Sequence, residues 1–528
     1  MIYLIAPGNF DNSAILVASA LERSCGLGQV TRVSINEWIN LSKNSVKLIS
    51  VFINPLEVWS SEIIEILLQP ENKTLMFGAL PTKLVNHFNA QVGPLTEETI
   101  NAAQCAPAQA YCSSKSALSI RYQNIQGLKS PVASRPCIRY DFTDEWNNLG
   151  FGAITANASI WSLSQTLNLL ETHELASLMI EDRKIGAYAG AWSEDSYVKG
   201  MALWFNRPVG PIDSQEWHIV EYFLSGAGYP ECACQPVLVE IPYGFDAAVT
   251  MRLDCDEDVE SSRTLWELYK SMGVPFSLAL HARVLEDPKH HVLPIEILRG
   301  GGAILSHTAT HAPNWGGSYE AAYKEGNVSA DLIANAIGYS VRYAVSPFHQ
   351  TPTYARSALA DVGYDGCIGG IVKNDYDFLM ARSGVPPFGV KGFIGHSQQC
   401  MFHGDCILTG KEPLMVYKEA FELARASKTL FGYLDHPFSG RYQYGWSSEN
   451  HRADIHKNFI EYIKKQGKIL FLNEVEAMDF LHDRAAIQIK DKDNQILYRM
   501  PTNPKSSYKQ SIEYGGEILV LNGELFIS

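Results

Sequence analysis

The chain has 528 residues, 46% of them hydrophobic and 19% charged, and this length predicts two or three domains. Its 57 acidic residues outnumber the 43 lysines and arginines, so the formal net charge is -14, which argues against DNA, RNA or an anionic membrane surface as the main partner. No apolar run reaches the ~18 residues that a transmembrane segment needs. The ten cysteines are scattered and the short apolar start does not resemble an export signal, so we expect reduced thiols and a cytoplasmic location.

The first part of the chain shows short apolar runs that alternate with segments of helical periodicity. This alternation predicts a parallel sheet covered by helices on both faces. The expected strands are Ile2–Ala6, Val46–Ile53, Thr74–Ala79 and Lys199–Trp204, and the expected helices are Asn12–Glu22, Ser61–Leu68, Pro81–Phe88 and Asp213–Ser225. We expect these elements to form an N-terminal α/β domain over residues 1–238 that is flavodoxin-like or amidotransferase-like. No nucleophile elbow accompanies it, and its function cannot be inferred from these residues.

A second and longer alternation follows over residues 239–485. The expected strands are Ala247–Asp254, Phe276–Leu280, Ala303–Leu305, Arg342–Ser346, Cys367–Ile371, Thr429–Leu434 and Lys468–Leu472. The expected helices between them are Ser261–Met272, Leu293–Leu298, Ala330–Tyr339, Tyr354–Val362, Met415–Ala426 and Ile455–Lys464. So many repeats predict a distorted or incomplete (β/α) barrel with its chemistry at the carboxyl ends of the strands. Residues 486–528 change to a pattern that indicates a small β appendage.

The first group of candidate functional residues lies in the acidic segment Met251–Asp258. Because side chains alternate along a strand, Asp254 and Asp256 project to the same side. Two carboxylates held together repel each other unless a cation or a shared proton relieves the repulsion. An acidic run alone is more often a solvated loop than a site.

The second candidate is the pair His307 and His311, which follows the strand expected at Ala303–Leu305. A spacing of four brings two imidazoles together on a helical turn or in a tight loop, and neutral imidazole is a preferred zinc ligand. A lone pair at this spacing is more often incidental. Combined with one of the aspartates, it would hold a divalent metal and leave coordination positions open, as hydrolytic metal sites require.

Two further points also follow expected strands. Pro347 and Phe348 come after one strand, and Asp435 and His436 end another. A proline follows His436 and stops the strand there. For His436 alone, a buried structural histidine is as good an explanation as a catalytic one.

Taken in this order, the four points resemble the motifs of the polysaccharide deacetylases, the NodB-homology group that forms carbohydrate esterase family 4. That family has two aspartates in its first motif, His-Ser-x-x-His in its second, Arg-x-Pro-aromatic in its third, and a histidine after a strand in its last. Here the second motif reads His307-Thr-Ala-Thr-His311, and Pro347 with Phe348 falls on the third. The resemblance covers residues 239–485 and implies a NodB-like barrel there.

The resemblance also implies functions for single residues and one divalent metal ion. Asp254 would be the base and His436 the acid, and the metal ligands would be Asp256, His307 and His311. Phe348 and Asp435 would bind or orient the substrate. Zinc is the favoured ion, and cobalt, nickel or manganese suit the same ligands.

Two departures from the family pattern leave alternatives open. Cys255 separates the two aspartates, which are usually adjacent, so base and ligand could exchange functions. Val345 stands where the family has an arginine that orients the base. Arg252 lies two residues before Asp254 on the same strand face and is a candidate for that function.

The predicted function is that of a metal-dependent N-deacetylase or deformylase acting on an N-acylated sugar, such as a precursor of a surface polysaccharide like O-antigen. One alternative is a metal amidohydrolase that acts on a non-sugar amide. The other is a non-catalytic carbohydrate-binding protein that has kept the deacetylase fold. The sequence gives no indication of the oligomeric state.

Overall fold

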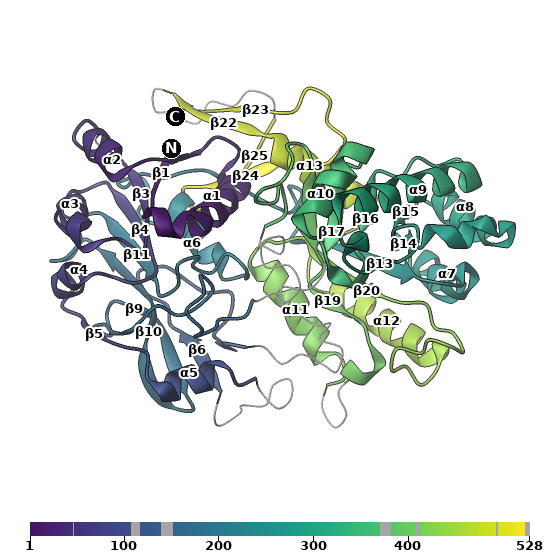
Figure 1. The fold of residues 1–528 in the computed structure, drawn as a ribbon, viewed down its shortest axis with the longest axis horizontal. Coiled ribbons are helices and arrows are strands. Elements are labelled where there is room, and N and C mark those ends of the chain that lie inside the picture. The colour runs from purple at the N-terminus through teal and green to yellow at the C-terminus, as the bar shows by residue number, and fades with distance from the viewer. Residues whose placement is uncertain are drawn as a thin grey trace.

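The structure is a computed structural model that describes residues 1–45, 47–106, 117–138, 152–369, 382–407, 412–492 and 495–522. Two bodies lie side by side: an N-terminal one, purple to blue, and a barrel in green (Figure 1). The C-terminal strands, in yellow, run across the top of both (Figure 1). None of the helices within the described ranges has the length and hydropathy needed to cross a bilayer.

A nine-stranded sheet forms the centre of the N-terminal body. Its order is β2 (Val30–Arg32), β1 (Ile2–Ile5), β3 (Ile49–Ile53), β4 (Lys73–Phe77), β11 (Met201–Phe205), β10 (Arg183–Ser193), β9 (Glu174–Ile180), β6 (Leu118–Tyr122) and β7 (Ser134–Pro136). The strands from β2 to β11 pair in parallel, but those from β11 to β7 pair antiparallel. The prediction of a parallel sheet is therefore right for one half and wrong for the other, where β9 and β10 form a hairpin without an intervening helix.

Helices cover both faces of this sheet. They are α1 (Asp11–Cys25), α2 (Ile35–Ser42), α3 (Ser60–Leu67), α4 (Thr82–His87), α5 (Glu97–Ala103) and α6 (Trp217–Ser225), and a two-stranded sheet of β5 (Gln91–Gly93) and β8 (Thr166–Asn168) lies beside them. Neighbouring residues of a strand point to opposite faces. In β3, Val51 therefore joins the core formed with α1, α5 and α6, and Phe52 joins the core formed with α2, α3 and α4.

The second body is built on a parallel sheet that curves into a barrel. Its strands are β13 (Ala247–Cys255), β14 (Ser277–Leu280), β15 (Ala303–Ser306), β16 (Tyr343–Val345), β17 (Gly366–Gly369), β18 (Ile394–Ser397), β19 (Cys400–Met401), β20 (Phe431–Asp435) and β21 (Ile469–Leu472). All of their pairings are parallel. The surrounding helices are α7 (Arg263–Ser271), α8 (Val292–Arg299), α9 (Tyr319–Ile337), α10 (Thr353–Val362), α11 (Met415–Ala426) and α12 (Glu449–Lys464).

The barrel closes through one bent segment, residues 394–401. At one end of the segment β18 pairs with β17, and at the other β19 pairs with β20. Between them the Gln398 amide donates to the Gly369 carbonyl (3.4 Å) and the Gln399 amide donates to the Gly432 carbonyl (2.8 Å). The predicted (β/α) barrel is confirmed, and its distortion is this bend.

A last helix, α13 (Glu474–Ala486), packs against the inner side of the barrel sheet. Asn473 and Glu476 form a capping box that fixes its start. Its residues Met478 and Leu481 share a buried core with Ala279 of β14. This helix therefore fills the interior below the strand ends that carry the candidate site.

The C-terminal strands join the two bodies. The connector strand β12 (Val237–Leu238) pairs with β24 (Ser511–Tyr514), which pairs with β25 (Glu517–Val520). A hairpin of β22 (Gln488–Lys492) and β23 (Gln495–Arg499) precedes them, and the side chain of Gln29 donates to the carbonyl of Ile489 in that hairpin. The boundaries at residues 238 and 485 stay predictions.

Candidate metal centre

The four predicted motifs meet at one end of the barrel. Asp254 is the penultimate residue of β13, His307 follows β15, Pro347 follows β16 and His436 follows β20. The carboxyl ends of parallel strands share one rim, and this brings residues that are far apart in the sequence to the same place.

Three side chains on this rim form a cradle of metal-ligand atoms. Oδ1 of Asp256 lies 3.5 Å from Nε2 of His307 and 3.4 Å from Nε2 of His311. All three ligand atoms lie within 4.8 Å of one another. Ligand atoms about 2.0–2.1 Å from a tetrahedral divalent ion lie roughly 3.4 Å apart, so the two distances from Asp256 suit a metal ion of this size.

The chemical state of the three residues fits a cation as well. Oδ1 of Asp256 is shielded from solvent and accepts no hydrogen bond within the described part of the chain, a costly arrangement that a bound cation would relieve. Nδ1 of His307 lies 3.2 Å from the Val345 carbonyl, which directs its Nε2 lone pair toward the cradle. Burial holds the pKa of His307 well below its ordinary value. Burial, followed by the charge of His281, lowers the pKa of His311 to about 4. Both imidazoles are therefore neutral near pH 7, as metal ligands must be.

A tight turn, rather than a helix, carries the two histidines. Thr308 and His311 both have positive φ, 66° and 55°. The carboxylate of Glu325 in α9 accepts the amides of Ala309 (3.0 Å) and Thr310 (2.9 Å) and so fixes the turn. Glu325 could not be identified from the sequence, because it belongs to α9 and lies fourteen residues after His311.

Asp254, beside the cradle, forms an ion pair with Arg252. Nε of Arg252 donates to Oδ1 (2.6 Å) and Nη2 donates to Oδ2 (3.1 Å), a bidentate contact in which both residues are buried. Burial opposes ionisation of Asp254, but the charge of Arg252 and its hydrogen bonds outweigh burial and hold the pKa of Asp254 well below its ordinary value.

The two aspartates therefore differ in their surroundings. Burial, followed by the negative charge of Asp254, raises the pKa of Asp256 to about 7. Asp256 lies against two imidazoles, and Asp254 lies against a guanidinium. This arrangement favours Asp256 as the metal ligand and Asp254 as the base, the assignment that Cys255 left open in the sequence.

Phe348 and its neighbour His349 form another wall of the site. The ring of Phe348 is 42% exposed and lies 4.7 Å from the ring of His311. His349, which sequence reasoning missed, is buried, and burial lowers its pKa to about 3. Both residues have positive φ, which turns this segment toward the rim.

Buried polar side chains hold the backbone of His436 in place. Asp435 is fully buried; its Oδ1 accepts the amide of His436 (2.7 Å), and its Oδ2 accepts Nε2 of His456 (2.9 Å). Arg452 donates to the carbonyl of His436. Burial lowers the pKa of His436, although the carboxylates of Asp254 and Asp435 oppose this effect.

Tyr444 is a further site residue that the sequence did not reveal. Its ring stacks on His436 with centroids 4.2 Å apart, and its hydroxyl lies 3.5 Å from Oδ2 of Asp256. It thus connects the candidate acid with the candidate metal ligand. Tyr442, which is partly exposed, lies against Tyr444 with ring centroids 6.0 Å apart.

No protein-family model and no curated protein matches the sequence. The structure is similar to solved polysaccharide deacetylases and members of carbohydrate esterase family 4. A candidate polysaccharide deacetylase from Mycobacterium smegmatis is 15% identical with a TM-score of 0.36, and the match covers 46% of this chain and 93% of that one.

Two other solved structures extend this comparison. A family 4 acetyl xylan esterase from Clostridium thermocellum, in complex with cobalt, is 12% identical with a TM-score of 0.28 over 44% of this chain and 89% of the other. Puue allantoinase is 15% identical with a TM-score of 0.35 over 49% and 96%. Likenesses this distant say nothing about activity, and the function proposed below depends on the residues of this chain.

Proposed function

We propose that the chain is a metal-dependent hydrolase of carbon–nitrogen bonds, an N-deacetylase or deformylase that acts on an N-acylated sugar. The observation that supports this proposal is the cradle of Asp256, His307 and His311 beside the Arg252–Asp254 pair and His436. Amide hydrolysis needs an activated water, a base and an acid, and this rim holds candidates for each within one site.

Zinc is the proposed ion, and cobalt, nickel or manganese suit the same three ligands. A divalent ion held there supplies Lewis-acid activation of water and of the amide carbonyl. The partly exposed ring of Phe348 lies 4.7 Å from the ring of His311, so a substrate at the cradle could contact it.

Asp254 and His436 divide the proton transfers between them. The low pKa of Asp254 keeps it ionised, so it is ready to take a proton from the attacking water, and Arg252 fixes its orientation. A cavity of about 20 Å³ beside Asp254, Asp256 and Tyr444 has room for one water molecule. In its protonated form, which the nearby carboxylates of Asp254 and Asp435 favour, His436 then delivers a proton to the leaving nitrogen.

The proposed substrate is a sugar because partly exposed aromatic rings flank the cradle. Phe348 and Tyr442 are both more than one-third exposed and can pack against the apolar face of a sugar ring. The proposed reaction is deacylation of a precursor of a surface polysaccharide, such as O-antigen, in the cytoplasm. The choice of a polysaccharide precursor as the substrate follows from the resemblance to the polysaccharide deacetylases in the four motifs.

Metal content is the direct test. We expect mass spectrometry of the purified wild type to find about one equivalent of zinc or a similar ion, lost in His307→Ala and Asp256→Ala and retained in His451→Ala, a partly exposed histidine of α12. Release of acetate or formate from N-acylated sugars should follow the metal content across these variants.

Two results would contradict the proposal in different ways. A wild type that binds no metal even after reconstitution would exclude the hydrolase. A wild type that holds the metal and binds N-acetylated sugars without releasing acid would identify a carbohydrate-binding protein with the same fold, and release of acid only from non-sugar amides would identify a different amidohydrolase.

A further inference from the structure

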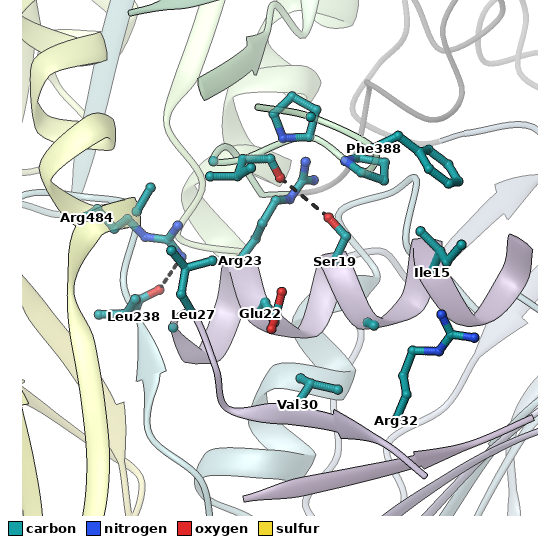
Figure 2. A pocket seen from close by; sticks show the side chains of 18 residues that line it. Ile15, Ser19, Glu22, Arg23, Leu27, Val30, Arg32, Leu238, Phe388 and Arg484 are labelled. Atoms are coloured by element: carbon teal, nitrogen blue, oxygen red, sulfur yellow. Dashed lines mark hydrogen bonds between the residues drawn. The ribbon is translucent and has the colours of Figure 1, made fainter. Parts of the chain in front are cut away.

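A second cavity, of about 420 Å³, lies between the two bodies (Figure 2). Helix α1 forms one wall and residues 384–389, which precede β18, form the other. Leu238, which precedes β13, lines it as well. Because the barrel strands are parallel, these residues lie at the amino ends of the strands, opposite the rim that carries Asp254 and the metal cradle.

One wall of this cavity carries a buried arginine without a partner. Arg23 in α1 is 6% exposed, and its Nε and Nη2 form no hydrogen bond in the described part of the chain. Nor does any carboxylate of the described residues lie within ion-pair distance of it. Figure 2 shows its side chain directed toward the segment that includes Phe388. An unpaired buried cation is costly, so a site that retains one is a candidate for an anionic ligand.

The charges around Arg23 strengthen this interpretation. Arg484 lines the same cavity, and its guanidinium donates only to backbone carbonyls, those of Leu238, Val239 and Ser383. Burial, together with Arg484 and Arg356 and against the opposing charge of Glu240, lowers the pKa of Arg23 to about 9. Arg23 therefore remains protonated near pH 7 and keeps its positive charge. The Glu22 carboxylate also lines the cavity, where it accepts the amide of Gly28.

The two free nitrogens of Arg23 and the remaining walls indicate the class of ligand. Nε and Nη2 are the two donors that a guanidinium offers side-on to a carboxylate. Pro386, Pro387 and the half-exposed Phe388 add an apolar surface. We propose that this cavity binds a small carboxylic acid, with its carboxylate on Arg23 and its apolar part against these three residues. Nε and Nη2 of Arg23 are shielded from solvent, so the proposal requires the Arg23 side chain to turn toward the cavity when the acid binds.

The test uses the full chain and three probes: benzoate, its neutral isostere benzamide, and inorganic phosphate. By isothermal titration calorimetry we expect saturable binding of benzoate, at least about ten-fold tighter than that of benzamide. Arg23→Met should abolish the difference and leave the fold intact, since an apolar side chain replaces an unpaired charge. Phe388→Ala, at the surface, should weaken benzoate binding several-fold.

Two controls separate this cavity from other sites. Arg121→Met removes an exposed arginine paired with Asp182 and should leave benzoate binding unchanged. His307→Ala should also leave benzoate binding unchanged. If benzoate bound at the metal centre instead of this cavity, His307→Ala would lose that binding. Equal binding of benzoate and benzamide, benzoate binding that survives Arg23→Met, phosphate binding without benzoate binding, or no binding of any probe would each overturn the proposal.

Discussion

Arg252 and Asp254 lie two residues apart on one face of β13, and both side chains are buried. A carboxylate buried alone would bind a proton. The bidentate guanidinium prevents this, so the strand itself supplies both the base and the charge that keeps the base ionised. Arg252 is thus the proposed counterpart of the arginine that the family pattern has at the position of Val345.

Replacement of this arginine should change the pH dependence of the enzyme. In Arg252→Met, burial acts on Asp254 unopposed by its neighbour and raises the pKa of that carboxyl, so the acidic limb of the pH–rate profile should move to higher pH. We expect kcat near pH 7 to fall about 10- to 100-fold, as for other residues that orient a catalytic group.

Comparison with two variants makes the assignment specific. Asp254→Asn should abolish turnover, and Arg263→Met, which removes a partly exposed arginine of α7, should leave the profile unchanged. A profile of Arg252→Met that superimposes on that of the wild type would show that Arg252 has no such function.

The residues predicted from the sequence share a simple property: each lies at the carboxyl end of a strand. Periodicity locates strand ends, and parallel topology brings them together, so Asp254, His307 and His436 could be identified from the sequence alone. His349 and Tyr444 could not, because positive φ values in their loops decide where they point. A positive φ is uncommon for residues other than glycine, so it could not be assigned to this histidine and this tyrosine from the sequence.

At the scale of elements, the closure of the barrel depends on the close approach of β17 and β18. Gly366 of β17 faces Ile394 of β18, and a Cβ added at Gly366 would lie 2.5 Å from the carbonyl oxygen of Ile394. A backbone atom cannot move aside as a flexible side chain does. The glycine is therefore required by the spacing of the two strands.

Gly366→Ala should force these strands apart. We expect it to lower the free energy of unfolding by about 1–3 kcal/mol, the usual cost of overpacking, and to lower the melting temperature accordingly. The matched control is Gly8→Ala, where an added Cβ meets no atom within 4 Å. Thermal unfolding of both variants measures the difference, and equal melting temperatures would show that the strands tolerate a wider spacing.

The elements themselves were predictable to different degrees in the two bodies. Strands such as β13 and β14 are separated by amphipathic helices, and this alternation is visible in the sequence. In the N-terminal body, β9 and β10 follow each other through a tight turn, and their buried residues form near-continuous apolar runs. Such runs predict a strand but do not indicate whether it pairs parallel or antiparallel. The sequence therefore did not reveal the antiparallel half of the sheet.

The two bodies are joined at the scale of the whole molecule by a buried ion-pair group. Arg382 donates from Nε to Glu221 of α6 (2.7 Å) and from Nη1 toward Glu240 (3.4 Å). Burial opposes ionisation of Glu221, but the charge of Arg382 outweighs it and holds the pKa of Glu221 below its ordinary value. Glu221 also accepts the hydroxyl of Ser24, and Glu240 accepts the amides of Ser383 and Leu430, but Arg382 is the arginine that both carboxylates share.

Arg382→Met should destabilise the whole molecule rather than one body. Two buried carboxylates would lose the guanidinium that they share, and we expect a loss of about 3–5 kcal/mol in the free energy of unfolding, measured by denaturant titration. The lowered pKa of Glu221 gives stability that is present above the ordinary glutamate pKa and is lost as the pH falls below it. The difference between variant and wild type should therefore shrink in acid, and a difference that stays constant with pH would contradict this assignment.

The pairing of β24 with β12 has a mechanical consequence. The chain leaves the N-terminal body through β12, forms the barrel, and comes back to the same body, where the carbonyl of Ile489 meets Gln29. The barrel is thus connected to the N-terminal body at both of its ends. A movement that separates the two bodies would therefore act on the connection through β12 and on the Gln29 contact at the same time.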